Sequence, residues 1–341
     1  MNNETICICG GGNLGTVLAG VASSKGYKVN LLTGSPEKWA KTIHITLCDN
    51  KNNEGQLDHI SKNPEEVIPQ SNIILFCLPG TAIEKYLTLI KPYISPGQII
   101  GSVFCSSGFF PMAEIILGNK QPLFGLQRVP FICRINNYGH SATILGQKES
   151  VKVAYLNIKH ETKLTKLLED IFLTKVIKLS SPWAVTLTNS NPLLHTARLY
   201  TLFRDYENGK VYPNNPLFYG DWTSEASELY IKMDGEFQKL ISLLNIPSEE
   251  IPTVLEYYES KDAKSLTKKI STIESWHNLP SPMIKTPKGW IPDFNSRYFT
   301  EDFLLGLKLI KELAAKENIP TPLIDKVYEW GMHRINASKK P

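Results

Sequence analysis

Residues 5–24 read TICICGGGNLGTVLAGVASS, in which a strand-like run, a glycine-rich turn and a helical pattern follow one another directly. The turn carries G-x-G-x-x-G, with glycines at 10, 12 and 15, and this strand-to-helix context is what gives the motif its meaning. Such glycines allow a tight turn, a close approach of the backbone to a pyrophosphate and packing of the helix on the strand. Amide groups at the helix start donate to phosphates. The stretch predicts a dinucleotide site formed by Gly10, Gly12, Asn13, Leu14 and Gly15; an ordinary glycine-rich turn is the alternative.

The same alternation of short β-branched runs and helical patterns continues to about residue 180, which is typical of a parallel sheet with crossover helices. The expected strands are Thr5–Cys9, Lys28–Leu32, Ile73–Cys77, Ile99–Phe104, Ser141–Leu145 and Lys152–Leu156. Farther on the apolar period lengthens, and the expected helices are Trp183–Tyr206, Ser224–Leu244, Ser265–Glu274 and Glu301–Asn318. The predicted fold class is α/β plus all-α: a Rossmann-type doubly wound sheet over residues 1–180, then a helical C-terminal domain over residues 181–341.

Composition supports a globular protein of two domains, because 341 residues exceed one ordinary core and the 42% hydrophobic and 21% charged residues are close to globular averages. Lys+Arg 37 against Asp+Glu 33 gives a net charge of +4, and the interspersed charges argue against nucleic-acid binding. No apolar run reaches the length of a membrane span and no signal-type segment opens the chain, so we expect no membrane partner and a cytoplasmic location.

All six cysteines lie in the first 133 residues, mostly within apolar strand-like runs. Cys7 and Cys9 share one face of a strand, but no second pair completes a zinc site. We therefore expect reduced, buried thiols and no metal.

The choice of cofactor depends on the end of the second strand, which reads LLTGSPEK over residues 31–38. The acidic residue that would bind a ribose 2′-hydroxyl is missing from its tip. Thr33 and Ser35 could hydrogen-bond a 2′-phosphate, with Lys38 reaching in from a following helix as a point charge. This predicts NADP. NAD stays open, since Glu37 could replace the missing acid and Lys38 could be an ordinary surface lysine.

A second loop at the same edge of the sheet follows the strand Ile73–Cys77. Loops at the carboxyl edge of an open sheet approach the ligand, so Leu78 and Pro79 are candidate cofactor contacts. Ordinary turn chemistry explains them equally well.

Two segments of the C-terminal half contain candidate catalytic residues. In NPLLH, residues 191–195, Asn191 is the expected N-cap and His195 lies in the first turns of a helix. The positive potential of a helix start disfavours imidazolium, so this histidine needs a carboxylate partner to act as an acid. A lone helical histidine is otherwise a core or surface residue.

The second segment is RYFTED, residues 297–302. Thr300 is the expected N-cap of the next helix and Asp302 lies in its first turn, where complementing the helix dipole is the simpler interpretation. Gly306 costs helix stability, which indicates that something packs closely against it.

Together these residues resemble the octopine and nopaline dehydrogenases, or opine dehydrogenases. The resemblance rests on residues 10–15, on FGLQRVP at residues 124–130, on residues 191–195, and on residues 297–302 followed by glycine at 306. In that family a Rossmann domain precedes a helical domain, and the enzymes condense an amino acid with a 2-oxo acid and reduce the imine with NAD(P)H. This sequence departs at residues 33–34, where family members often carry a basic residue.

The resemblance implies roles for particular residues: His195 is the acid/base, Asp302 orients it, and Arg297 holds the carboxylate of the 2-oxo acid. A planar guanidinium fork suits that last task. Gln127 and Arg128 are expected to line the cleft, with an interdomain salt bridge as the alternative for Arg128. Aromatic residues of the helical half, Tyr219 and Tyr298 among them, are expected mainly to pack.

Other functions remain open at this stage. A reductase of similar build, such as a ketopantoate reductase or a glycerol-3-phosphate dehydrogenase, would be expected to use a lysine of the helical domain. Lys232 and Lys239 lie on an expected helix, but no motif surrounds them. A cofactor-binding sensor without turnover is a third possibility. The expected partners are a small amino acid and a 2-oxo acid, with a homodimer as the possible assembly.

Overall fold

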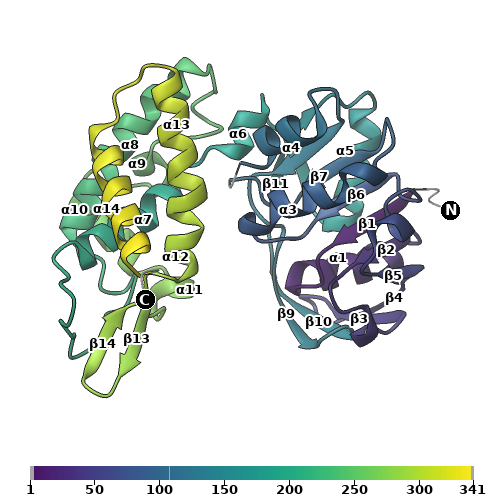
Figure 1. Cartoon of the computed structure of the whole chain (residues 1–341), viewed down its shortest axis with the longest axis horizontal. Coiled ribbons are helices and arrows are strands. Elements are labelled where there is room, and N and C mark those ends of the chain that lie inside the picture. Colours follow the sequence, from purple (N-terminus) through teal and green to yellow (C-terminus); the bar gives the residue numbers. More distant parts are fainter. Residues whose placement is uncertain (1–3, 107, 339–341) are drawn as a thin grey trace. The chain divides into compact units, whose positions relative to one another are not determined.

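The computed structural model describes residues 4–106 and 108–338. The chain divides into two compact units, unit 1 (Met1–Thr186) and unit 2 (Leu187–Pro341), coloured purple to teal and teal to yellow in Figure 1. Within the described ranges, no helix is both long and apolar enough to cross a membrane.

Unit 1 is built on an eight-stranded sheet in the order β12-β11-β8-β7-β6-β1-β2-β5. Neighbouring strands run parallel, apart from β11, which is antiparallel to β8. The order reverses between β1 and β6, which makes the carboxyl ends of these two strands the switch point of a doubly wound sheet. The predicted Rossmann-type sheet is thereby confirmed. Its strands are β1 (Thr5–Cys9), β2 (Lys28–Leu32), β5 (His59–Ser61), β6 (Ile73–Phe76), β7 (Ile99–Ser102), β8 (Leu123–Leu126), β11 (Ser150–Leu156) and β12 (Lys175–Lys178).

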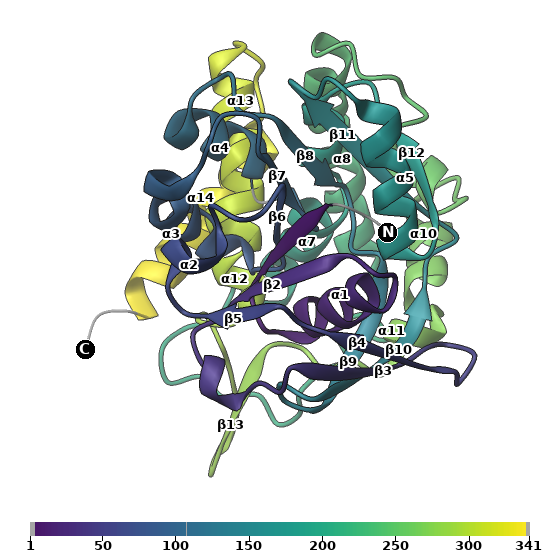
Figure 2. The ribbon, with the colours of Figure 1, turned by 90° about the vertical axis from the view of Figure 1, so that its right-hand side faces the viewer.

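Helices cover both faces of this sheet, as Figure 2 shows. α1 (Asn13–Ser24) and α5 (Glu161–Phe172) contact each other on one face; α2 (Pro64–Val67), α3 (Gly80–Ile90) and α4 (Phe109–Leu117) form a continuous layer on the other. Because both faces are covered, the central strands are buried along almost their whole length, and this is why they read as unbroken apolar runs.

A second, four-stranded sheet in the order β4-β3-β10-β9 packs on α1. The expectation that Ser141–Leu145 belongs to the parallel sheet is wrong: this segment lies in β10, which pairs antiparallel with β9. Alternating burial along β10 is the signature of a strand with one solvated face, and an apolar run does not reveal which sheet it joins. The strands are β3 (Thr42–Thr46), β4 (Asn52–Gln56), β9 (Phe131–Asn137) and β10 (Ser141–Gln147).

Unit 2 confirms the helical C-terminal domain and adds a hairpin, β13 (Met283–Thr286) and β14 (Gly289–Pro292), that the sequence did not predict. Its helices are α7 (Asn191–Phe203), α8 (Ser224–Leu243), α9 (Val254–Tyr257), α10 (Ala263–Ser271), α11 (Glu274–His277), α12 (Arg297–Thr300), α13 (Lys308–Lys316) and α14 (Pro322–Ser338).

Two expected helices are interrupted. Residues 183–206 form α6 (Pro182–Thr186), which belongs to unit 1, and α7 in unit 2. Between them the side chain of Asn189 donates to Asp234 Oδ1 at 2.8 Å and to the carbonyl of Pro252 at 2.7 Å. These tertiary bonds stabilise a non-helical link that local periodicity does not report.

The helix expected over residues 301–318 begins instead as a π-helical turn, Asp302–Leu307, and continues as α13. Thr300 is not its N-cap: it is the last residue of α12, whose own N-cap is Ser296. The wider turn accommodates Gly306 against α7, where a Cβ would lie 2.6 Å from Pro192 Cγ. The close packing expected at this glycine is therefore that of a crossing helix.

Candidate active site

The loop that follows β1 has the geometry of a pyrophosphate-binding turn. Gly10 has a φ of +110°, and a Cβ there would lie 2.7 Å from the carbonyl oxygen of Cys77. A Cβ on Gly15 would lie 1.8 Å from the carbonyl of Gly10, whereas no described atom lies within 4 Å of one built on Gly12. Gly12 is the N-cap of α1 and offers no capping side chain to the helix amides. The residues present therefore fit a dinucleotide, whose phosphates the first turn of α1 would hold.

The side chains of Asn13 and Leu14 make contacts within unit 1. Asn13 Oδ1 accepts a hydrogen bond from the backbone N–H of Ile135 at 2.9 Å, which ties β9 to the start of α1. Leu14 packs against the core. Any contact with phosphate at these two positions would be made by their backbone amides.

The segment after β2 carries the three residues predicted to hold a 2′-phosphate. Thr33 is buried, with its hydroxyl 2.9 Å from a Cβ placed on Gly11, while Ser35 is half-buried and Lys38 exposed. The helix expected to present Lys38 does not exist: Pro36–Lys38 is a single 3-10 turn, because the chain passes directly into β3.

Sequence reasoning missed Trp39, which is buried beside the phosphate loop. Its ring lies 2.7 Å from a Cβ built on Gly11 and meets the Tyr138 ring edge-on at 5.7 Å. Its indole Nε1 is buried without a hydrogen-bond partner among the described residues, so an N–H donor is available at the edge of the loop.

Leu78 and Pro79 lie at the switch point, as expected for residues that follow β6. Leu78 Cδ2 is 2.9 Å from a Cβ built on Gly10, and Pro79 is the N-cap of α3. The two glycine-containing loops therefore contact each other at the carboxyl ends of β1 and β6.

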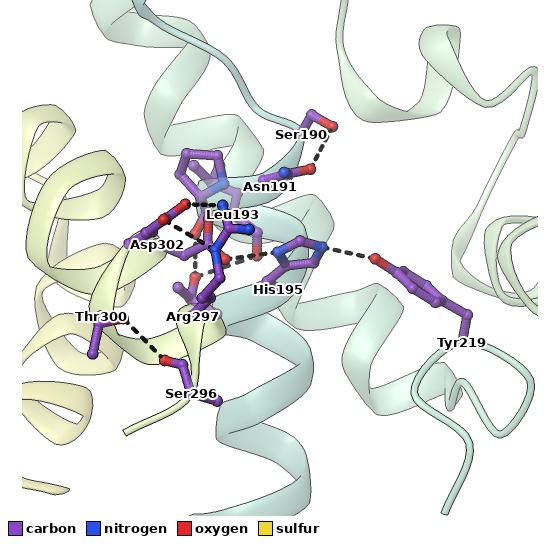
Figure 3. Close-up of polar contacts among 12 residues, drawn as sticks. Ser190, Asn191, Leu193, His195, Tyr219, Ser296, Arg297, Thr300 and Asp302 are labelled. Atoms are coloured by element: carbon purple, nitrogen blue, oxygen red, sulfur yellow. Dashed lines mark hydrogen bonds and ion pairs between the residues drawn. The ribbon is translucent and has the colours of Figure 1, made fainter. Parts of the chain in front are cut away.

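In unit 2, His195 and Asp302 are brought together across 107 positions of sequence. His195 Nδ1 lies 2.7 Å from Asp302 Oδ2 (Figure 3), and the histidine is 8% exposed. Helix α7 begins one residue before the expected point, with Ser190 as its N-cap in place of Asn191. A carboxylate only accepts hydrogen bonds, so Nδ1 carries the proton of this pair.

The other ring nitrogen of His195 has a partner that sequence reasoning treated as a packing residue. Nε2 lies 2.7 Å from the hydroxyl of Tyr219, which follows α7 in a loop. Burial raises the pKa of Tyr219 well above its ordinary value, and the nearby Tyr298 adds to the shift. A phenol that keeps its proton is a donor for Nε2 whenever that nitrogen carries no hydrogen. No local pattern marks this residue, since its partner is set by how the loop folds back.

Arg297 is engaged by a neighbouring carboxylate. Its Nε and Nη2 donate to the two oxygens of Glu301 at 3.1 and 2.9 Å, and this pairing raises the pKa of Arg297. The side chain is 78% exposed. The guanidinium thus already holds one carboxylate in the two-pronged geometry that Arg favours.

Comparisons with known proteins agree along the chain. Residues 178–334 match the model of the NAD/NADP octopine/nopaline dehydrogenase alpha-helical domain, and residues 5–117 match that of the NAD-dependent glycerol-3-phosphate dehydrogenase N-terminus. The chain is 27% identical to the octopine dehydrogenase of Pecten maximus over 97% of its own length and 90% of that protein. It is also 27% identical to the tauropine dehydrogenase of Arabella iricolor, over 95% and 90%.

Over nearly its whole length the chain is similar to the opine dehydrogenases. A solved octopine dehydrogenase with NADH and L-arginine shares the fold, with a TM-score of 0.87 at 23% identity over 98% of this chain and 90% of that one. Because the matched model and relatives are dehydrogenases, the protein is an NAD(P)-dependent oxidoreductase.

Gln127 and Arg128 follow β8 in unit 1, whereas His195, Arg297 and Asp302 belong to unit 2. Gln127 Nε2 donates to the carbonyl of Ala184 at 3.0 Å and so holds α6. Arg128 is half-buried, and its charge adds to the burial that lowers the pKa of Lys148. The expectation that both residues line the cleft stays a prediction.

Proposed function

We propose that this protein condenses an amino acid with a 2-oxo acid and reduces the resulting imine, which makes it an oxidoreductase of the CH–NH group. The observation that carries the proposal is the pair of His195 and Asp302, at 2.7 Å in a mostly buried part of unit 2. A histidine with a carboxylate on one nitrogen is the usual protein form of a general acid/base near neutral pH.

His195 gives or takes the proton that accompanies reduction or oxidation of the substrate. Asp302 keeps the proton on Nδ1 and stabilises the imidazolium, which a helix start would otherwise disfavour. The rings of Phe218 and Tyr298, with centroids 5.6 and 4.8 Å from that of His195, exclude water from the pair. When bound, the reduced nicotinamide supplies the hydride.

Arg297 binds the carboxylate of the 2-oxo acid in this proposal. Glu301 now occupies the guanidinium fork, so the substrate would replace an internal carboxylate with its own. One carboxylate replaces another on the guanidinium, so Glu301 can return when the product leaves.

The alternatives are not favoured. A 2-oxo acid reductase that uses a lysine of the helical domain would need Lys232 or Lys239 in a built site, and both lie exposed on α8. The match to the glycerol-3-phosphate dehydrogenase model covers only the N-terminal segment, residues 5–117.

The test measures oxidation of NADPH and NADH against a panel of 2-oxo acids, each with and without amino acids. Oxidation that requires both substrates supports the proposal. Cofactor oxidation that needs only a 2-oxo acid and is unaffected by amino acids would identify the protein as a simple 2-oxo acid reductase. The absence of turnover with every pair would favour a cofactor-binding sensor.

For the cofactor we propose NADP over NAD, because the strand end at Thr33 lacks an acid and Lys38 is exposed beside Ser35. Protein fluorescence should give a lower dissociation constant for NADPH than for NADH. Lys38→Ala should weaken NADPH selectively, and Lys166→Ala, an exposed lysine on α5, is the matched control. Tighter binding of NADH by the unaltered protein contradicts the proposal.

We place the protein in the cytoplasm, where its six cysteines, all free in the structure, would stay reduced. The homodimer stays a prediction that light scattering on the purified protein tests.

A further inference from the structure

Both ring nitrogens of His195 are engaged by groups of unit 2. Nδ1 donates to Asp302 and Nε2 faces the Tyr219 hydroxyl, each at 2.7 Å. Neither nitrogen is free to touch a substrate. A general acid/base must reach the proton that it transfers, directly or through one bridging group. Here the bridging group is already present.

We propose that the hydroxyl of Tyr219 passes the proton between His195 and the substrate, so that Asp302, His195 and Tyr219 form one relay (Figure 3). The inference rests on the proposed acid/base role of His195. It assigns a catalytic function to a side chain that packing alone does not explain.

The first support is that Tyr219 cannot easily leave its position. Arg198 lies one turn after His195 on α7 and is 2% exposed. Its guanidinium donates to three backbone carbonyls of the Tyr219 loop, those of Leu217 at 3.3 Å, Phe218 at 2.9 Å and Asp221 at 2.6 Å. If the loop moved away, the buried guanidinium of Arg198 would lose its hydrogen-bond acceptors. The free energy of such an unpaired buried charge is high.

The ring of Tyr219 is held as firmly as its backbone. Trp222 stacks on it with an interplanar angle of 8° and a centroid distance of 6.3 Å, and Trp276 packs on it at 5.1 Å. Arg198 in turn lies 5.7 Å from the Trp222 ring centre. These ring contacts hold the Tyr219 hydroxyl next to Nε2 in this structure.

The relay balances without a free phenolate. In the reductive direction the Oη–H bond of Tyr219 breaks as a new bond to hydrogen forms on the substrate nitrogen. In the same motion the Nε2–H bond of the imidazolium breaks and Oη–H re-forms. The substrate gains one proton, His195 becomes neutral, and its Nδ1–H bond stays intact and hydrogen-bonded to Asp302. A bound reduced nicotinamide would supply the hydride. Oxidation runs the steps in reverse.

Burial raises the pKa of Tyr219, and the charge of Asp302 raises it further, so a lasting phenolate is unfavourable. A transfer in which the oxygen gains one proton as it loses another avoids that state. Two other phenols act on Tyr219: Tyr298, which shares a side-chain hydrogen bond with it and whose ring packs on His195, and Tyr258. The Arg297–Glu301 pair directly precedes Asp302 in the sequence.

Tyr219→Phe tests the relay, since it removes one oxygen and keeps the ring between the two indoles. We expect kcat to fall by about 100-fold or more, within the usual range for loss of a general acid/base, with KM values and cofactor affinity within about threefold. Tyr155→Phe is the matched control: Tyr155 is 8% exposed, Tyr219 is 6% exposed, and Tyr155 loses a hydroxyl contact of 2.8 Å to Thr165 in unit 1. Its kcat should not change.

A second measurement separates a relay from simple support of the histidine. Single-turnover oxidation of the reduced cofactor is followed in mixtures of H2O and D2O. If two protons move in the same step, the rate constant depends on the deuterium fraction along a curve. In Tyr219→Phe this dependence should become linear. A linear dependence in the unaltered enzyme overturns the relay.

The outcomes also separate the two proposals. If Tyr219→Phe keeps its kcat while His195→Gln loses it, the relay is wrong and the acid/base role of His195 stands. If both variants keep kcat, the proposed function of the pair fails as well.

Discussion

His195 and Asp302 should behave as one catalytic unit, because the carboxylate acts only through the imidazole. We expect His195→Gln and Asp302→Asn each to lower kcat by about 10²- to 10⁴-fold, and the double variant to lose little more than the worse single one. Steady-state kinetics beside melting temperatures provide the measurement. Additive losses would indicate separate roles. A lower melting temperature with kcat intact would reduce the pair to a core histidine and a helix-dipole partner. Cofactor affinity, which depends on unit 1, is the internal control.

If Arg297 binds the substrate carboxylate as proposed, Glu301 competes with that carboxylate for the guanidinium. Glu301→Gln removes the charge that fills the guanidinium fork, so KM for the 2-oxo acid should fall. The Arg297 side chain is 78% exposed and that of Glu301 20%; ion pairs with an exposed partner contribute about 0.2–1 kcal/mol, which corresponds to a fall of about 1.4- to 5-fold. Glu312→Gln, which breaks a similarly spaced surface pair with Lys308, should leave KM unchanged. An unaltered KM in Glu301→Gln, together with an unaltered KM in Arg297→Lys, removes Arg297 from the substrate site.

Among the elements, the π-helical turn Asp302–Leu307 determines where Asp302, the aspartate of the proposed catalytic pair, lies. It is seated on α7 through Gly306, where a Cβ would lie 2.6 Å from Pro192 Cγ. Gly306→Ala should push the turn away from α7 and destabilise the fold by about 1–3 kcal/mol, as overpacking does. It should also lower kcat, since Asp302 opens the same turn.

Gly235→Ala is the control for Gly306→Ala. Gly235 lies inside α8, and no described atom stands within 4 Å of a Cβ built there, so alanine should stabilise the protein by about 0.4–1 kcal/mol. Urea unfolding and kcat measure both variants. If the two alanines have the same effect, the contact between the turn and α7 is not what positions Asp302.

At the scale of the whole molecule, buried phenols and thiols make the fold sensitive to alkali. Burial raises the pKa of Tyr27 from 10.0 to about 12 and that of Cys133 from 9.0 to about 11. The folded state retains these protons at a pH where the unfolded chain has lost them. Stability should therefore be constant with respect to these groups below about pH 9 and should fall as the pH rises toward 12.

Melting temperatures between pH 8 and 11 test this expectation. Tyr27→Phe should flatten the decline above pH 10, although it also gives up the hydrogen bond to Asp170 and so starts from a lower value. A decline of equal slope in the variant would show that Tyr27 contributes nothing to the alkaline limit.

The cofactor loop and the histidine segment could be predicted from the sequence because their signals are local. A strand, a glycine turn and a helix occupy adjacent residues at 5–24, and a helix start at Asn191–Pro192 places His195 within its first turns. The spacing of apolar residues separated the sheet half from the helical half for the same reason. Strands buried on both faces give short continuous apolar runs, and helices buried along one stripe give apolar residues every three or four positions. Family resemblance then paired His195 with Asp302, 107 positions away.

The remaining features depend on contacts between segments that are far apart in the chain. Apolar alternation looks the same in β10 as in a strand of the main sheet, so the second sheet was not foreseen. The broken helix before α7 exists because Asn189 bonds to Asp234 and Pro252. The contact between Tyr219 and His195 spans 24 residues and depends on a loop whose carbonyls accept hydrogen bonds from Arg198. Periodicity reports that a side chain is buried; the partner that its polar atom finds is set by how the elements pack.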